Sequence, residues 1–225
     1  MSEQKVAISN HPVITRRPRL SDGEILPKAV RNFENHCQNY FINVKGGVAD
    51  DEKVARILSC FENYLVNDWI AGDRDRLITL TFEQFMSEFR TRWLPFDWER
   101  DLCIQVLSAR FDPKKIRFEA WANQVQTLNV YLRGTPSHLD EHRMRLQLEA
   151  NIDEELRSLV REAKANQITE LHIWVAEVKD LDDYRHDRRK HMREAFDDMI
   201  RARKGQFSNS SRNTNTKRRV KLPYA

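Results

Sequence analysis

The chain has 225 residues, of which 40% are hydrophobic and 32% are charged, and its formal net charge is +4 at pH 7. This composition supports one domain or two small ones, and no apolar run approaches the roughly 18 residues that a membrane-spanning helix needs. Cys37, Cys60 and Cys103 are scattered and odd in number, which predicts buried thiols in a reducing compartment and no disulfide framework.

The first 26 residues mix proline, arginine and serine without periodicity, and we expect them to form an extended or disordered arm. They lack the basic-then-apolar order of a signal peptide. From Pro27 onward, a residue suited to the first position of a helix, apolar side chains recur at helical spacing. Because the chain has only 6 glycines and no sustained β-branched alternation, the sequence predicts an all-α fold.

Residues 27–111 are predicted to form an N-terminal lobe of about five helices. Its clearest pattern is "FEQFMSEFRTRW" at 82–93, where aromatic residues at steps of three, four and four share one helix face. Thr81 can cap this helix, Pro95 ends it, and Asp97 is expected to cap the next. Aromatic stripes at this spacing are usually core, which we favour over a ligand-binding or base-stacking role. Across the whole chain the predicted core aromatics are Trp69, Phe82, Phe85, Phe89, Trp93, Trp98, Trp121 and Trp174.

The stretch "FDPKKI" at 111–116 is a predicted boundary, because a residue before proline favours extended backbone. Residues 112–200 are then predicted to form a C-terminal lobe of about four helices, with Ser137, Asp153 and Thr169 as expected caps. The last helix is long and charged, and its apolar residues form one thin stripe, namely Met192, Phe196 and Met199. Such a stripe favours exposure or pairing with another chain.

Residues 201–225 carry eight cations and no acid, so the remaining residues 1–200 have a net charge of −4 within the total of +4. A segment this poor in apolar residues is predicted to be a disordered basic tail that binds phosphate backbones. The predicted nucleic-acid-binding residues are Arg201, Arg203, Lys204, Arg212, Lys217, Arg218, Arg219 and Lys221. The run "KRRVK" at 217–221 also fits a nuclear-import signal.

One catalytic pattern occurs, "HLDEH" at 138–142, which fits the H-x-x-E-H zinc-protease motif with Glu141 as general base. It falls at a predicted helix start, where acids simply complement the helix dipole, and we favour a solvated first turn. Phosphate-binding, nucleophile-elbow, aspartic-protease and C-x-x-C patterns are absent from the sequence. The sequence therefore predicts no enzyme, no catalytic or metal-binding residue, no cofactor and no small-molecule substrate.

Three stretches of the sequence share the spacing and residue classes of a known protein family. They are "FENHCQNYFINVKGG" at 33–47, "KVARILSCFENYLVNDWIAG" at 53–72, and the run at 81–132, which contains an aromatic helix, a proline turn and an aromatic-led helix. Together they resemble the Gag capsid region of gypsy-type LTR retrotransposons and of genes domesticated from such transposable elements. The likeness covers roughly residues 27–185 and rests on spacing and residue class. The sequence departs from the family pattern in two places. Arg110-Phe111-Asp112 stands where many such Gags have a glutamine, and the C-terminal zinc knuckle of the family is missing.

The resemblance implies two capsid-like lobes that self-assemble into homo-oligomers or virus-like particles around RNA in the cytoplasm, with nuclear entry through the basic tail as a further expectation. The alternative is a helical nucleic-acid-binding regulator whose tail is a nuclear-import signal. A DNA-reading helix needs one face dense in Arg, Asn and Gln, whereas acids interrupt the arginines of 184–204. We therefore favour the structural, RNA-gathering protein.

Overall fold

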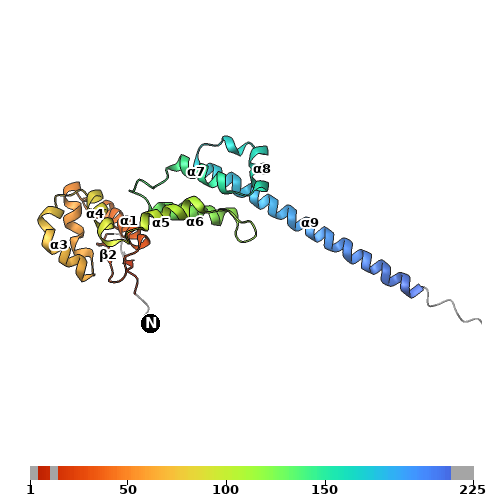
Figure 1. Ribbon diagram of the computed structural model, residues 1–225, viewed down its shortest axis with the longest axis horizontal. Coiled ribbons are helices and arrows are strands. Elements are labelled where there is room, and N and C mark those ends of the chain that lie inside the picture. The colour runs from red at the N-terminus through yellow and green to blue at the C-terminus, as the bar shows by residue number, and fades with distance from the viewer. Residues whose placement is uncertain (1–4, 11–14, 214–225) are drawn as a thin grey trace, which may run out of the picture. The chain divides into compact units, whose positions relative to one another are not determined.

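The structure is a computed structural model that describes residues 5–10 and 15–213, with side chains described as far as Arg201. Within these residues the chain is mainly helical and contains one short two-stranded sheet. The all-α prediction is thereby confirmed (Figure 1).

The elements follow one another along the chain with short connections. They are β1 (Ser9–Asn10), β2 (Arg19–Leu20), α1 (Pro27–Asn43), η1 (Asp50–Glu52), α2 (Lys53–Ile57), η2 (Leu58–Cys60), α3 (Tyr64–Leu77), α4 (Phe82–Trp93), α5 (Trp98–Ser108), α6 (Phe118–Tyr131), α7 (Glu141–Asn151), α8 (Glu154–Glu162), η3 (Ala165–Gln167) and α9 (Leu171–Asn213).

The chain groups into two compact units. Unit 1 comprises Met1–Arg110 and Ala120–Asn151, and unit 2 comprises Phe111–Glu119 and Ile152–Ala225. The first passage from one unit to the other falls beside the predicted boundary at 111–116. The grouping differs from the predicted consecutive lobes in residues 120–151, which belong with unit 1, and the lobe division itself stays a prediction.

The N-terminal arm is ordered in its described part, in contrast to the disorder that was one expectation for it. Ser9 and Asn10 pair antiparallel with Leu20 and Arg19, and Ala7 and Leu20 are buried in the core of unit 1. Gly23 permits this arrangement, because a Cβ there would lie 2.5 Å from the Lys5 carbonyl oxygen. The pairing and burial of the arm were not predicted, because a few widely spaced apolar residues give no periodic signal.

Helix α4 supplies the centre of the unit 1 core. Thr81 and Gln84 form a reciprocal capping box, with the Gln84 amide donating to Thr81 Oγ1 at 3.2 Å and the Thr81 amide donating to Gln84 Oε1 at 2.9 Å. Phe85 and Phe89 are completely buried, and the Phe89 ring stacks on that of Phe61 at 5.1 Å. The aromatic stripe thus faces inward. Figure 1 shows α4 beside α1 and α3.

The other predicted core aromatics fall into two groups. Four of them are partly buried against the core of unit 1, namely Trp69, Phe82, Trp93 and Trp98. Trp121 and Trp174 are buried. In unit 2, the Trp174 ring meets that of Phe118 edge to face at 5.8 Å. Trp121 and Trp174 are therefore interior side chains, whereas the other four rings are partly buried at the edge of the unit 1 core.

Two expected helix caps differ from those in the structure. Asp97 precedes α5, but its side chain makes no capping hydrogen bond. Ser137 was expected to cap the following helix, yet α7 begins only at Glu141, and Asp140 Oδ1 accepts from the Arg143 amide at 2.8 Å. A turn from Thr135 to Asp140 delays the helix start, because Asn129 of α6 binds both the amide and the carbonyl of Leu139.

Candidate interaction site on the final helix

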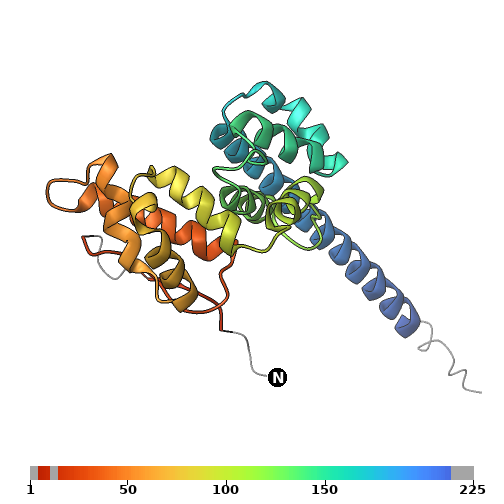
Figure 2. The same cartoon turned by 60° about the vertical axis from the view of Figure 1, so that its left-hand side comes forward.

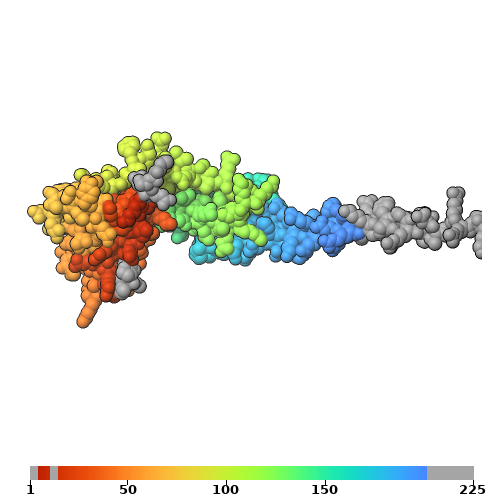
Figure 3. Space-filling model, turned by 90° about the horizontal axis from the view of Figure 1, so that it is seen from below, coloured from red at the N-terminus to blue at the C-terminus, as the bar shows by residue number. Residues whose placement is uncertain are grey.

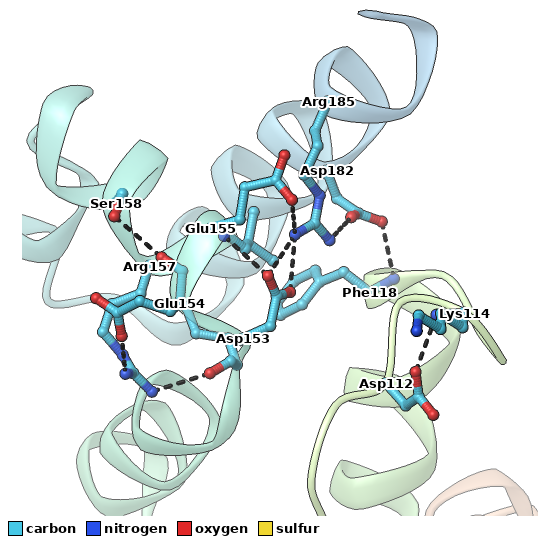
Figure 4. A network of polar contacts seen from close by, with 12 residues as sticks. Asp112, Lys114, Phe118, Asp153, Glu154, Glu155, Arg157, Ser158, Asp182 and Arg185 are labelled. Carbon is cyan, nitrogen blue, oxygen red and sulfur yellow. Dashed lines mark hydrogen bonds and ion pairs between the residues drawn. The ribbon is translucent and has the colours of Figure 1, made fainter. Parts of the chain in front are cut away.

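Helix α9 is fixed to unit 2 by a buried guanidinium. The side chains of Arg185 and Asp182 are each only 1% exposed, and Arg185 Nη2 donates to Asp182 Oδ1 at 2.5 Å. Arg185 Nη1 donates to both carboxylate oxygens of Asp153, at 2.7 and 2.8 Å. Figure 4 shows the guanidinium between the two aspartates. Glu155 Oε2 also lies 3.8 Å from Arg185 Nη1. One buried cation therefore faces three carboxylates and donates hydrogen bonds to two of them.

Each aspartate also satisfies the start of a neighbouring helix. Asp182 Oδ2 accepts from the Phe118 amide at the start of α6, at 3.1 Å, and Asp153 Oδ1 accepts from the Leu156 amide at the start of α8, at 3.2 Å (Figure 4). The ring of Phe111 lies 5.8 Å from the guanidinium carbon. Because orphan amides at helix starts need acceptors, Arg185 holds in place the carboxylates that cap two helices.

Beyond this anchor, the described part of α9 is exposed to solvent. Every residue from Asp187 to Arg201 is exposed, and Figure 3 shows this part of the helix bare on the face in view. Met192, Phe196 and Met199 are 64%, 59% and 64% exposed, and their spacing of four and three residues puts them on one face. We call this set the α9 stripe. Figure 2 shows α9 continuing well past α8.

Charge is arranged in blocks around the α9 stripe. Four cations, Arg188, Arg189, Lys190 and Arg193, are followed by three acids, Glu194, Asp197 and Asp198. Arg189 contacts Glu155 of α8, and Arg201 lies 3.7 Å from Asp198 with both side chains more than three-quarters exposed. Exposed ion pairs of this kind contribute about 0–1 kcal/mol, so most of these charges remain available to a partner.

The predicted nucleic-acid-binding residues lie at and beyond the end of this surface. Arg201 is exposed on α9. Arg203, Lys204 and Arg212 fall in the backbone of α9, which runs to Asn213 where disorder was expected from residue 201, and their side chains lie outside the described part. A second group lies outside the described residues altogether, namely Lys217, Arg218, Arg219 and Lys221.

The "HLDEH" pattern does not form the two-histidine helix face that a zinc protease needs. His138 lies in the turn before α7, whereas His142 belongs to its first turn, so the two are not four residues apart on one helix. No cluster of three potential metal ligands occurs in the residues that the structure describes. Partial burial, followed by the charges of Arg133 and Arg31, lowers the pKa of His138.

Two of the three cysteines, Cys37 and Cys60, are buried as predicted, whereas Cys103 is only partly buried. Burial raises the pKa of Cys37 well above its usual value, and burial likewise raises that of Cys60 to about 11. Since the thiolate is the reactive form, neither side chain is prepared for nucleophilic or redox chemistry.

Sequence reasoning located the α9 stripe but missed the anchor beneath it. The sequence does contain a signal for this anchor. Asp182 and Arg185 are three residues apart, a spacing that allows an ion pair on one helix, and Asp153 is an expected helix cap. No protein-family model, curated protein or solved structure matches this chain. In the described residues, no helix combines the length and apolar character needed to cross a bilayer.

Proposed function

We propose that this protein is a structural, capsid-like subunit without enzymatic activity, which self-associates and gathers RNA non-specifically through its C-terminal cations. The observation that carries the proposal is the exposed part of α9, because three large apolar side chains stand in water on one helix face. Large apolar side chains gathered on one exposed face are typical of an interaction surface. A second copy fits this face, because its adjacent cationic and acidic blocks offer each copy an oppositely charged partner.

The RNA part of the proposal rests on charge. The last 25 residues hold eight cations and no acid, and nothing in their composition supports base-specific recognition. The resemblance of residues 33–132 to Gag capsid regions agrees with this combination of helical self-association and sequence-independent RNA binding. Particles would then form in the compartment where the RNA resides, which we expect to be the cytoplasm.

The test is the oligomeric state of the full chain, measured by light scattering and electron microscopy with and without RNA. We expect concentration-dependent oligomers or particles from the parent protein. Substituting Phe196→Ser together with Met199→Ser should raise the concentration needed for association at least tenfold, and the helical circular dichroism of the units should be unchanged, since both side chains are exposed.

The matched control is Ile42→Ser, which removes a large apolar side chain of α1 that is even more exposed, at 78%. It should associate as the parent does. A parent that stays monomeric with RNA overturns the proposal, and an equal loss of association in the control variant overturns the assignment to α9. Retention of full RNA affinity after removal of the C-terminal cations would favour the alternative of a helical nucleic-acid-binding regulator.

A further inference from the structure

Unit 1 contains a buried charge cluster with more cations than acids. Arg31 of α1 and Arg90 of α4 share a single carboxylate, Glu34, with side chains only 8%, 9% and 5% exposed. Arg31 Nη1 donates to Glu34 Oε2 at 2.7 Å, and Arg90 Nη1 donates to Glu34 Oε1. The three groups together carry one net positive charge that has been removed from water.

This cluster lacks the balance found around Arg185. There the guanidinium donates to two carboxylates and has a third, Glu155, within 3.8 Å, whereas here two guanidinium groups face one carboxylate. Arg31 Nε is buried and has no hydrogen-bond partner. An uncompensated buried charge is strongly unfavourable, and a buried donor without an acceptor adds a further cost. The cluster therefore has both the charge and the free donor to hold an anion.

The cluster opens into a hollow of about 370 Å³ that is lined by these three residues. Its rim includes Arg133 and Glu83, both exposed, so the lining as a whole stays at one net positive charge. Gly134 permits the turn to lie over Arg90, because its φ is +84° and a Cβ there would lie 3.0 Å from Arg90 Nη2. The positive charge also reaches His138, whose pKa is lowered first by partial burial and then by the charges of Arg133 and Arg31.

We propose that this hollow binds a phosphate group carried by a small molecule. Guanidinium groups present planar forks of donors that match phosphate oxygens and hold them in pairs. The volume exceeds that of one phosphate and lies in the range of small-molecule pockets, which leaves room for a compact polar substituent. This inference goes beyond the proposed function and does not depend on it.

The test is calorimetric titration of the full chain with inorganic phosphate and with ribose 5-phosphate, against chloride at equal ionic strength. Both should bind and raise the melting temperature, since a ligand that binds only the folded state stabilises it. Arg133→Ala should weaken binding about threefold to tenfold, as expected for loss of an exposed charge-assisted contact. Glu83→Gln should strengthen it by a similar factor, because a repelling charge is removed.

The matched control is Arg74→Ala, which removes an exposed cation of α3 that does not line the hollow and should leave affinity unchanged. Phosphate should also raise the pKa of His138, measured by NMR, because a bound anion offsets the nearby arginines. Equal weakening by Arg74→Ala and Arg133→Ala overturns the site. Binding of a short oligouridine without a terminal phosphate, but not of inorganic phosphate, overturns the small-molecule ligand in favour of an RNA backbone.

Discussion

The two buried arginine clusters show how local charge balance separates a structural role from a binding role. Arg185 is matched by Asp182 and Asp153, whose remaining lone pairs accept backbone amides. Arg31 and Arg90 share one acid and keep a buried donor unpaired. Buried ion pairs contribute little net stability, but removal of one partner typically costs about 3–5 kcal/mol.

We therefore expect Arg185→Met to lower the free energy of unfolding by about 3–5 kcal/mol, because Asp182 is left buried without its cation. Adding Asp182→Asn should restore part of this loss, since the amide oxygen still accepts from Phe118 while the buried charge disappears. Urea denaturation of both variants measures the difference. Arg189→Met is the matched control, because its ion pair is exposed and should contribute less than about 1 kcal/mol. A double variant no more stable than the single one contradicts this account.

At the residue scale, the sequence predicts roles that depend on near neighbours. Asp153 was expected to cap a helix and does so, because a cap requires only the next three residues. Its second role, binding Arg185, joins residues 32 positions apart, and no local pattern signals it. The sharing of Glu34 by Arg31 and Arg90 spans 56 positions and was missed for the same reason.

At the element scale, α4 contributes a buried aromatic face to the core of unit 1. Phe85 and Phe89 are fully buried, and Trp69 lies beside them with ring centroids 5.9 and 6.4 Å away. Trp93 is only partly buried at the end of the helix. The inward face is therefore fully buried in the middle of the helix and partly exposed at both ends, where Phe82 and Trp93 lie, and truncation should cost less at the ends than in the middle.

Phe89→Ala should destabilise unit 1 by about 3–5 kcal/mol, as buried aromatic truncations do. Because whole domains are stable by only about 5–15 kcal/mol, thermal melting should show partial or complete unfolding. Trp93→Ala should have a smaller effect, since part of its ring is already in water. If neither variant melts below the parent, the stripe contributes no core packing and a surface role for the rings must be reconsidered.

Elements were predictable where periodicity was strong. The stripe in 82–93 specified both the helix and its buried face, since a 3.6-residue repeat leaves one solution. The start of α7 was misplaced because the side chain of Asn129, on another helix, decides where that turn ends. The exposed end of α9 was visible as a thin stripe, but its continuation to Asn213 passes through Gly205 and polar residues with low helix propensity.

At the scale of the whole molecule, charge is divided between residues 1–200, with a net charge of −4, and the basic segment that follows. We expect RNA affinity to reside in that segment and to depend on salt. If all eight cations contact single-stranded RNA, the logarithm of affinity should fall against that of salt with a slope of nearly −6, from about −0.7 per contact. Partial engagement should give about −3 to −4 on the same rule.

Binding titrations at several salt concentrations check this on the full chain and on a variant lacking residues 201–225. The variant should lose RNA binding and keep the helical spectrum of residues 1–200. A chain with glutamine at the eight cationic positions is the control, since it preserves length while removing charge. Unchanged affinity in either variant places the RNA site on the helical body, with residues 184–200 as the leading candidate.

Sequence patterns predict the grouping of elements into compact units less well than they predict the elements themselves. Pro113 and the break in periodicity predicted a change near 111–116, and the chain does pass between units there. The return of residues 120–151 to unit 1 depends on contacts such as Gln147 of α7 with the carbonyl of Val106, at 3.0 Å. These contacts join distant segments, and hydrophobic periodicity does not predict them because it is a local property of the sequence.

Arg185, the last buried side chain in the described part of α9, also marks a change in expected local stability along the helix. Beyond Asp187 every described side chain of the helix is exposed, and the ion pair that joins it to another element there, Arg189 with Glu155 of α8, is itself exposed. Because most helical stability in proteins comes from tertiary packing, this part of α9 should be only weakly stabilised. Its amides should therefore exchange with solvent deuterium by local fraying, many times faster than those beside Arg185, and trypsin should cleave there first. A partner that covers the α9 stripe should slow this hydrogen exchange. Protection of these amides therefore reports directly whether the helix has bound a partner.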